Sequence, residues 1–299
     1  MAEVLFEPIP IAYRGLLADQ HLVDAQQFGQ SLVGASKIAN SVCHELLFAI
    51  VTHDPRKYGV RFCVGPSREN GLLQEIVAVI VSEFPLFPPF LTHIGRVFIE
   101  EMIKAMVNSV LKRPSDVSKA LDVIGKQSEQ FSDLARSMHE GHMRDKEWLE
   151  GLVTDLVREN RRPLRQFPEP VGRTVRAIAL GKDDPLVIDE PVAEVLRSRE
   201  GLELGDTDEY EIELVGVFKN NGVCRVKLLG RDKIVLGKIS DPALDQPNNI
   251  YTRALNEGRS LRVIAKPTLK DGELYKLFIT SAWLPGELPP LREPMPIAG

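Results

Sequence analysis

The chain has 299 residues, of which 43% are hydrophobic and 26% are charged. These proportions are typical of a globular protein, and they exclude a disordered, collagenous or disulfide-stapled chain. A chain of this length predicts two domains. The formal net charge is −5, and even the most basic part, residues 209–299, carries only 13 Lys+Arg against 11 Asp+Glu. Charge alone therefore does not indicate capture of DNA or RNA.

The three cysteines, Cys43, Cys63 and Cys224, show no CxxC spacing and are odd in number. They predict neither a disulfide framework nor a zinc site, and a reducing cytoplasm fits them best. The opening MAEVLFEPIP lacks the basic residues and the apolar core of a signal peptide. His139 and His142 lie three residues apart, but Gly141 separates them and no further cluster of His or Cys accompanies them. No metal site and no cofactor are predicted.

The most membrane-like stretch runs from residue 72 to residue 110, but charged residues interrupt it throughout and Pro85, Pro88 and Pro89 break it. No window of about 20 residues stays apolar, so no transmembrane segment is predicted. Buried helices of a core are the preferred interpretation. A contact with a membrane surface stays open as the alternative.

The N-terminal part predicts a strand, a long helix and a second strand. Residues 4–13 are β-branched and aromatic but contain two prolines, which indicates an edge or irregular strand. From Asp24 to about Ile50 apolar residues recur every three or four positions, as in a helix with one buried stripe. Residues 58–64 alternate like a strand. Together they predict a β-α-β unit, right-handed if its strands pair in parallel.

Further helices are expected over 72–84 and 91–112, and a helical pair over 115–160. The first helix of that pair carries a seam of apolar residues at near-heptad spacing, which can pack within the chain or against another copy. This association seam consists of Val117, Leu121, Ile124, Phe131, Leu134 and Met138.

The segment RRPLRQFPEP, residues 161–170, predicts a stiff connector and the domain boundary, because it combines three prolines with three cations. Beyond it the apolar period changes from 3.6 to 2, giving six strands and two short helices at 190–198 and 250–258, with Asn221-Gly222 as a hairpin turn. We therefore predict an α+β protein: a mostly helical domain 1–165, a small β-barrel-like domain 171–284 and an extended proline-rich tail 285–299.

The richest polar cluster lies where the first strand passes into the first helix. It consists of Tyr13, Arg14, Asp19, His21 and Asp24. Loops at such junctions often bind ligands, a histidine beside an aspartate can act as a general base, and an arginine can hold an anion. The alternative is purely structural, with Asp24 capping the helix and the other polar residues solvated.

Glycine-rich phosphate loops, GxSxG and HExxH are absent from the sequence, so catalytic residues are not assigned. In the predicted barrel, Arg225 and Lys227 alternate with apolar residues, but no aromatic residue alternates with them. A solvated strand face is the expected role, and nucleic acid is not the expected partner.

Diffuse patterns along most of the chain resemble a group of uncharacterised bacterial two-part proteins of unknown function. FEPIPIAYRGLLADQHLVDAQQFGQSLVG, YGVRFCVG and the helical middle resemble their N-terminal half. PLVIDEPVAEVL, EYEIELVGVF, LGKISDPAL and residues 251–266 resemble their small C-terminal β domain. The resemblance implies the two-part architecture and a bacterial or mobile-element origin. In some relatives an apolar helical pair follows the second strand, whereas here the charged, proline-broken segment 72–112 takes its place.

Three functions remain open from the sequence. The first is a non-enzymatic binding or regulatory protein, in a defence or mobile-element setting, that associates with itself or with a partner protein. The second is an enzyme or ligand-binding protein that uses the Tyr13–Asp24 junction for a nucleotide or another anion. The third is nucleic-acid binding through an OB-like C-terminal barrel.

Overall fold

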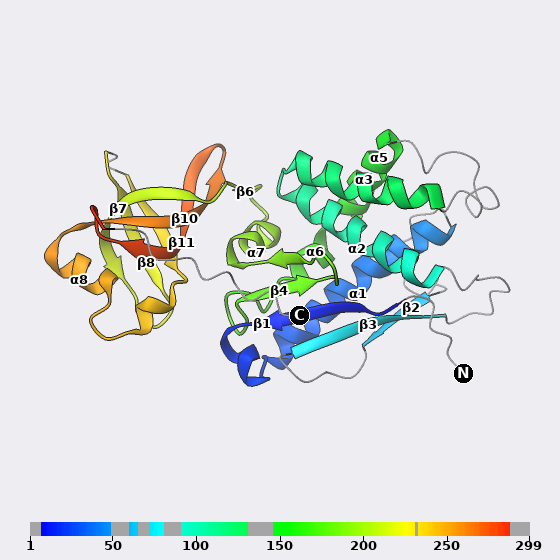
Figure 1. Cartoon of the computed structure of the whole chain (residues 1–299), viewed down its shortest axis with the longest axis horizontal. Helices are drawn as coiled ribbons and strands as arrows, with labels where there is room; N and C mark the ends of the chain where they lie inside the picture. The colour runs from blue at the N-terminus through cyan, green and yellow to red at the C-terminus, as the bar shows by residue number, and fades with distance from the viewer. Residues whose placement is uncertain are drawn as a thin grey trace. The chain divides into compact units, whose positions relative to one another are not determined.

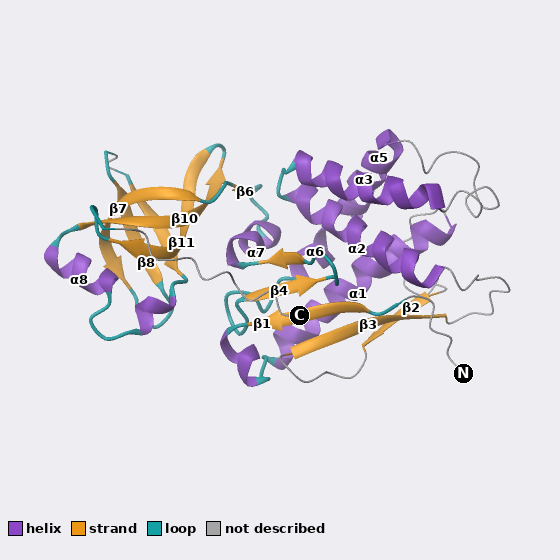
Figure 2. Cartoon of the chain, viewed as in Figure 1, coloured by secondary structure: helices purple, strands orange, loops and turns teal. Residues whose placement is uncertain are grey.

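The computed structural model of the chain describes residues 7–48, 60–64, 72–80, 91–130, 146–230 and 233–287 (Figure 1). The chain divides into two compact units, residues 1–198 and 199–299. Helices and an antiparallel sheet make up the first unit, and a small barrel makes up most of the second (Figure 2). The chain is therefore an α+β protein, as predicted.

A five-stranded antiparallel sheet in the order β2-β3-β1-β4-β5 forms the centre of the first unit. Its strands are β1 (Ile9–Arg14), β2 (Val60–Val64), β3 (Leu72–Ile80), β4 (Ala177–Leu180) and β5 (Leu186–Ile188). β1 is the middle strand, and its alternate residues Ile9, Ile11 and Tyr13 are buried. This alternation places one face of β1 against the core.

The prolines of the first strand predicted an edge position, which is wrong. Pro10 lies in the middle strand of the sheet, and its carbonyl oxygen accepts a hydrogen bond from the Gly181 amide at 3.0 Å. In an antiparallel ladder the nitrogen and the oxygen of one residue point to the same neighbour. Pro10 has no N–H, and an N–H at this position would face Gly181, just beyond the end of β4 at Leu180. The ladder between β1 and β4 therefore loses no hydrogen bond at Pro10.

The described helices of the first unit pack against one another and against the sheet. They are α1 (Ala25–Phe48), α2 (Leu91–Val110), α3 (Pro114–Gln130), α5 (Lys146–Glu159), α6 (Arg161–Gln166) and α7 (Glu190–Arg197), with a short 3-10 helix η1 (Leu16–Gln20). In α1 the stripe Ala35, Ile38, Ala39 and Val42 is buried, as the 3.6-residue period predicted. α2 contacts α1, α3 and α5.

The helix predicted over residues 72–84 is wrong, because residues 72–80 form strand β3. β3 pairs with β1 on one side and β2 on the other, both antiparallel. β1 and β2 therefore run in the same direction, but they are not neighbours as a simple β-α-β unit would make them. The short apolar run LLQEIVAVI is compatible with either a buried helix or a buried strand. Pairing with the preceding strand β2 and with β1, which is distant in sequence, decided between them.

The predicted domain boundary at residues 161–170 is also wrong, since the chain divides after Ser198. Residues 161–166 form helix α6, which packs against α1, and Leu164 and Phe167 are buried. At Gly34 on α1 a Cβ atom would lie 2.7 Å from the Phe167 nitrogen, so the glycine permits this close approach. Beyond α6, β4, β5 and α7 complete the first unit rather than the barrel.

Five strands of the second unit close into a barrel (Figure 1). They are β7 (Asp208–Val217), β8 (Val223–Leu228), β9 (Ile234–Ile239), β10 (Ser260–Lys270) and β11 (Glu273–Trp283), and the two-residue strand β6 (Glu203–Leu204) pairs with β10 outside the ring. β7, β8 and β9 are antiparallel neighbours, β9 pairs in parallel with β11, and β10 joins β11 to β7. With helix α8 (Ile250–Glu257) between the third and fourth strands, this is the topology of an OB-fold.

The barrel interior is apolar, and α8 contributes to it through Tyr251 and Ala254. The hairpin predicted at Asn221-Gly222 is confirmed: Gly222 has a φ of +68°, and a Cβ atom there would lie 2.3 Å from the Ile239 carbonyl oxygen. Only glycine fits this turn without displacing the end of β9. In the part of the chain that the structure describes, no helix is both long enough and apolar enough to span a bilayer.

Candidate functional site

Tyr13, the first residue of the predicted junction site, belongs to the core. Its ring meets the edge of Phe28 on α1, with the ring centroids 5.1 Å apart, and its hydroxyl lies 3.0 Å from Ser31 Oγ. Ser31 in turn donates to the Phe167 carbonyl oxygen at 2.5 Å, so Tyr13 is the donor to Ser31. Burial raises the pKa of the Tyr13 hydroxyl, and the hydrogen bond with Ser31 opposes this only in part. This geometry fastens β1 to α1 and α6.

The other junction residues serve the local backbone. Asp19 accepts a hydrogen bond from the Gly15 amide at 2.8 Å, and Asp24 accepts one from the Gln27 amide at 2.9 Å, as an N-cap of α1 does. His21 is exposed, with a left-handed φ of +59° at the end of η1. Arg14 is half-buried on β1. The described contacts of Asp19 and Asp24 match the structural alternative, and they do not join these side chains to Tyr13.

The association seam is divided between described and undescribed residues. Leu121 and Ile124 on α3 are buried within the chain, where α3 packs against α2 and α5, and Val117 is half-buried. Phe131, Leu134 and Met138 lie outside the described residues, as do His139 and His142. Within the described residues, no three His, Cys, Asp or Glu side chains are grouped so that they could hold a metal ion.

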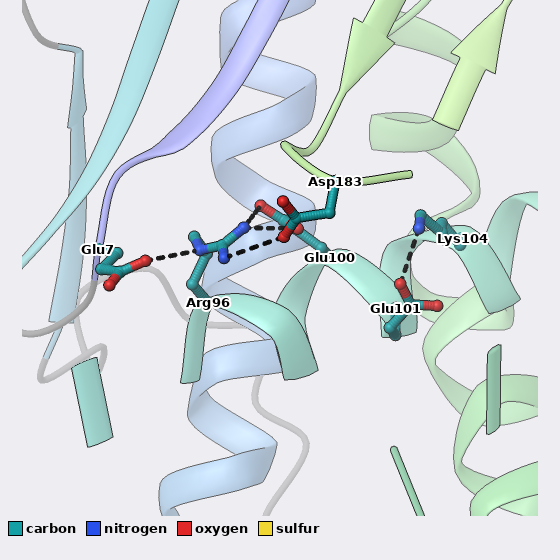
Figure 3. Close-up of polar contacts among 6 residues, drawn as sticks. All are labelled: Glu7, Arg96, Glu100, Glu101, Lys104 and Asp183. Carbon is teal, nitrogen blue, oxygen red and sulfur yellow. Dashed lines mark hydrogen bonds and ion pairs between the residues drawn. The ribbon is translucent and has the colours of Figure 1, made fainter. Parts of the chain in front are cut away.

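A cluster of buried charges on α2 was missed by the sequence analysis. Arg96 is fully buried and lies between three carboxylates (Figure 3). Its Nη1 donates to both oxygens of Glu100 at 3.0 and 3.1 Å, its Nε to Glu7 at 3.1 Å, and its Nη2 lies 3.6 Å from Asp183. One guanidinium thus connects the segment before β1, helix α2 and the loop between β4 and β5.

A second ion pair lies one turn further along α2. Lys104 Nζ donates to Glu101 at 2.7 Å and lies 3.6 Å from Asp184 of the same loop. Burial raises the pKa of Glu100, although Arg96 opposes the shift. For Arg96, burial acts to lower the pKa, but Glu100 and Glu7 outweigh it and raise the pKa. The cluster holds the β4–β5 loop against α2, and its geometry is that of a structural clamp.

The spacing of four charged residues in the sequence is a signal for this clamp. Arg96, Glu100, Glu101 and Lys104 stand at i, i+4, i+5 and i+8 of a helix that contains no other Asp, Glu, Lys or Arg. These charges argue against a membrane helix. The same spacing places all of them near one side of an α-helix, where ion pairs form.

The outer surface of the barrel carries the most distinctive exposed chemistry of the described chain. Successive residues of a strand point to opposite faces, so alternate positions of β8, β9 and β11 point outward. The register aligns them in rows: Val223, Lys238 and Phe278 in one, Arg225, Leu236 and Lys276 in the next, and Lys227 with Ile234 in a third. We call this surface the cationic face; it consists of Val223, Arg225, Lys227, Ile234, Leu236, Lys238, Lys276 and Phe278. Arg225, Ile234 and Leu236 are exposed, Phe278 is buried, and the other members are half-buried.

Four of the eight positions of the cationic face are cations, and none is a carboxylate. Two aliphatic side chains lie among them with large exposed fractions, 53% for Ile234 and 48% for Leu236. Carboxylates gather on the next strand instead: Glu209, Glu211 and Glu213 alternate along β7, and Arg262 of β10 pairs with Glu209 at 3.0 Å. Glu213 stands directly opposite Lys227, so the carboxylates of β7 border the cationic face on that side.

The alternation of residues in β8 predicted Arg225 and Lys227 on an outer strand face, but not the rest of the cationic face. The missing information was the register of β9 and β11, which places Leu236 between Arg225 and Lys276. β9 and β11 are separated by more than thirty residues of sequence, and their parallel pairing follows from barrel closure. No local pattern encodes that neighbourhood.

Comparison with protein families gives matches to both units. A domain of unknown function (DUF7946) matches residues 9–197, which is more than half of the chain. The chain belongs to this family. A second family of unknown function (DUF7947) matches residues 206–283, which include the five strands of the barrel. The interval between the two matches contains the division after Ser198, and not the proline-rich segment 161–170. Among curated proteins none matches the chain.

Proposed function

We propose that the chain is a non-enzymatic binding protein that acts through association, and that its barrel engages an anionic macromolecule across the cationic face. The observation that carries the proposal is the set of four cations around Ile234 and Leu236 with no carboxylate among the eight positions. Exposed aliphatic side chains ringed by charge are typical of interaction surfaces. The second and third strands of an OB-fold also commonly bear its ligand, which is support from the fold alone.

The proposal also includes the cellular location and the origin of the protein. A cytoplasmic location is supported by the three cysteines, which are all free thiols. A bacterial or mobile-element origin, with a role in defence, has the sequence resemblance as its support. Neither point affects the chemistry of the cationic face.

The proposal is tested with fluorescein-labelled poly-L-glutamate and the full chain. We expect the fluorescence anisotropy to rise on binding at 50 mM salt and the affinity to fall as salt is added, since exposed charges are screened. The variant Arg225→Glu/Lys238→Glu should bind at least tenfold more weakly.

The matched control is Arg253→Glu/Arg259→Glu, which changes the net charge equally at α8 and just beyond it. It should bind like the unchanged protein. Equal loss of affinity in both variants, or no binding by the unchanged protein, would contradict the proposal.

A further inference from the structure

Leu236 lies at the centre of the cationic face. Across the strands its neighbours are Arg225 on β8 and Lys276 on β11, and along β9 they are Ile234 and Lys238. Neighbouring strands are about 4.8 Å apart and residues two apart on a strand about 6.6 Å, so all of these side chains lie within reach of one ligand group. An apolar centre within a polar rim is the usual anatomy of a protein–protein interface.

The backbone beneath the cationic face is fully engaged in the barrel. β8 pairs with β7 and β9, β9 with β8 and β11, and β11 with β9 and β10. No edge is open at these strands for the addition of a partner strand. A partner must therefore be recognised by the side chains of the face.

The exposed aliphatic residues of the cationic face bear on whether its anionic partner is a nucleic acid or a protein. Single-stranded nucleic acid binds proteins by phosphate contacts together with base stacking on aromatic rings. The one aromatic residue in the rows, Phe278, has an exposed fraction of 1%, and the Lys276 ammonium lies 4.6 Å from its ring centroid. The exposed Phe218 stands opposite Val223 just beyond β7, at the margin of the face, and the exposed Tyr275 is not a member of the rows. Leu236 and Ile234 offer apolar contact, which phosphates do not use.

From these observations we infer that the partner is an acidic protein segment with aliphatic side chains at its contacting positions. This inference rests on the proposed function and adds the class of partner. Carboxylates of the segment pair with Arg225, Lys238 and Lys276, and its aliphatic side chains cover Leu236 and Ile234. Charge pairing at an exposed surface contributes little by itself, so the apolar contact at Leu236 provides the selectivity.

The test compares three labelled probes at 150 mM salt with the full chain. The probes are a 16-residue peptide that repeats Glu-Glu-Leu-Leu, a peptide of the same length and charge that repeats Glu-Glu-Ser-Ser, and a 16-nucleotide oligothymidine. We expect the leucine peptide to bind at least tenfold more tightly than either other probe. Leu236→Ser should remove that advantage and leave the affinity for the serine peptide unchanged.

The control variant Leu22→Ser makes the same change at an exposed leucine of the other unit and should behave like the unchanged protein. Equal binding of both peptides, with loss in Arg225→Glu/Lys238→Glu, would overturn the inference and leave the proposed function standing. Tightest binding of oligothymidine would overturn it in favour of nucleic acid. Failure of every probe to bind would overturn the proposed function as well.

Discussion

A single buried guanidinium connects three parts of the first unit, and its partners differ in their access to water. Glu100 is almost fully buried beside Arg96, whereas the Glu7 and Asp183 side chains are 44% and 79% exposed. Removal of Arg96 would leave Glu7 and Asp183 solvated, but it would leave the buried Glu100 carboxylate without the guanidinium that pairs with it. A stranded buried charge costs far more than a lost surface ion pair.

Arg96→Met should therefore lower the free energy of unfolding by about 3 kcal/mol at pH 7, measured by urea denaturation. The double variant Arg96→Met/Glu100→Leu should recover most of that loss, because no buried carboxylate then remains unpaired. In the single variant the loss should shrink as the pH falls and Glu100 becomes protonated. Lys119→Met, which breaks the exposed pair with Asp116, serves as the control and should change stability by less than about 0.5 kcal/mol. Equal losses in the single and double Arg96 variants would contradict this account.

Cys224 in the barrel core predicts a loss of stability at alkaline pH. Burial raises its pKa from 9.0 to about 12, against a smaller opposing effect of Lys276. Between these values the unfolded thiol loses its proton and the folded one keeps it, so the free energy of unfolding falls as the pH rises. One such group contributes at most about 1.4 kcal/mol per pH unit.

The measurement for Cys224 is urea denaturation at pH 8, 9, 10 and 11. The slope above pH 9 should be reduced in Cys224→Ala, although that variant is less stable at every pH because of the cavity that it leaves. Buried Tyr251 has a raised pKa as well and should maintain part of the slope. An unchanged slope in Cys224→Ala would show that the thiol does not contribute.

At the scale of elements, the N-cap residues of two helices differ in their burial and in the number of hydrogen bonds that they make. Asn249 caps α8 through the Thr252 amide at 2.9 Å, and its Nδ2 donates to the carbonyl oxygens of Leu244 and Gln246. Asn249 is buried, whereas Asp24, the cap of α1, is exposed. Loss of Asn249 therefore leaves the buried bond to the Leu244 carbonyl and the part-buried bond to the Gln246 carbonyl unmade, whereas loss of Asp24 leaves only an amide that water can reach.

Asp24→Ala should lower the free energy of unfolding by about 1 kcal/mol, the usual value of an N-cap. Asn249→Ala should lower it by about 2 to 3 kcal/mol, because the cap is lost and two carbonyl acceptors, one of them in a buried hydrogen bond, lose their donor. Equilibrium urea denaturation of both variants measures the difference. Equal losses would mean that water replaces the Asn249 amide without cost.

At the scale of the whole molecule, the first unit ends with segments that follow the proline-rich stretch. All four residues of β4 are buried, and β4 pairs with β1 in the centre of the sheet. A chain cut at the predicted boundary would lose β4, β5 and α7 and leave one side of β1 unpaired. The physical domain therefore needs residues up to about 198.

Expression of residues 1–198 should give a folded protein with a cooperative thermal transition, measured by circular dichroism. Residues 1–170 should give an aggregated product or one without a cooperative transition, because β1 would present an unpaired apolar edge. A cooperative transition of the shorter fragment would mean that β4 and β5 are dispensable. It would restore the boundary predicted from the prolines.

Local patterns in the sequence predicted much of the architecture. Periods of 3.6 and 2 residues located α1, α2 and the five barrel strands, because an amphipathic element carries its own signal. They also predicted the α+β class and the turn at Gly222. The Asp24 cap was predicted as the structural alternative for the junction site.

Tertiary structure alone decided what depends on pairing between distant segments. β3 became a strand because β1 and β2 lie on either side of it, and β4 joined the first sheet although it follows the prolines. Arg96 meets Asp183 across more than eighty residues, and Leu236 meets Arg225 and Lys276 only through barrel register. Such neighbourhoods arise from chain closure and strand register, which no short stretch of sequence contains.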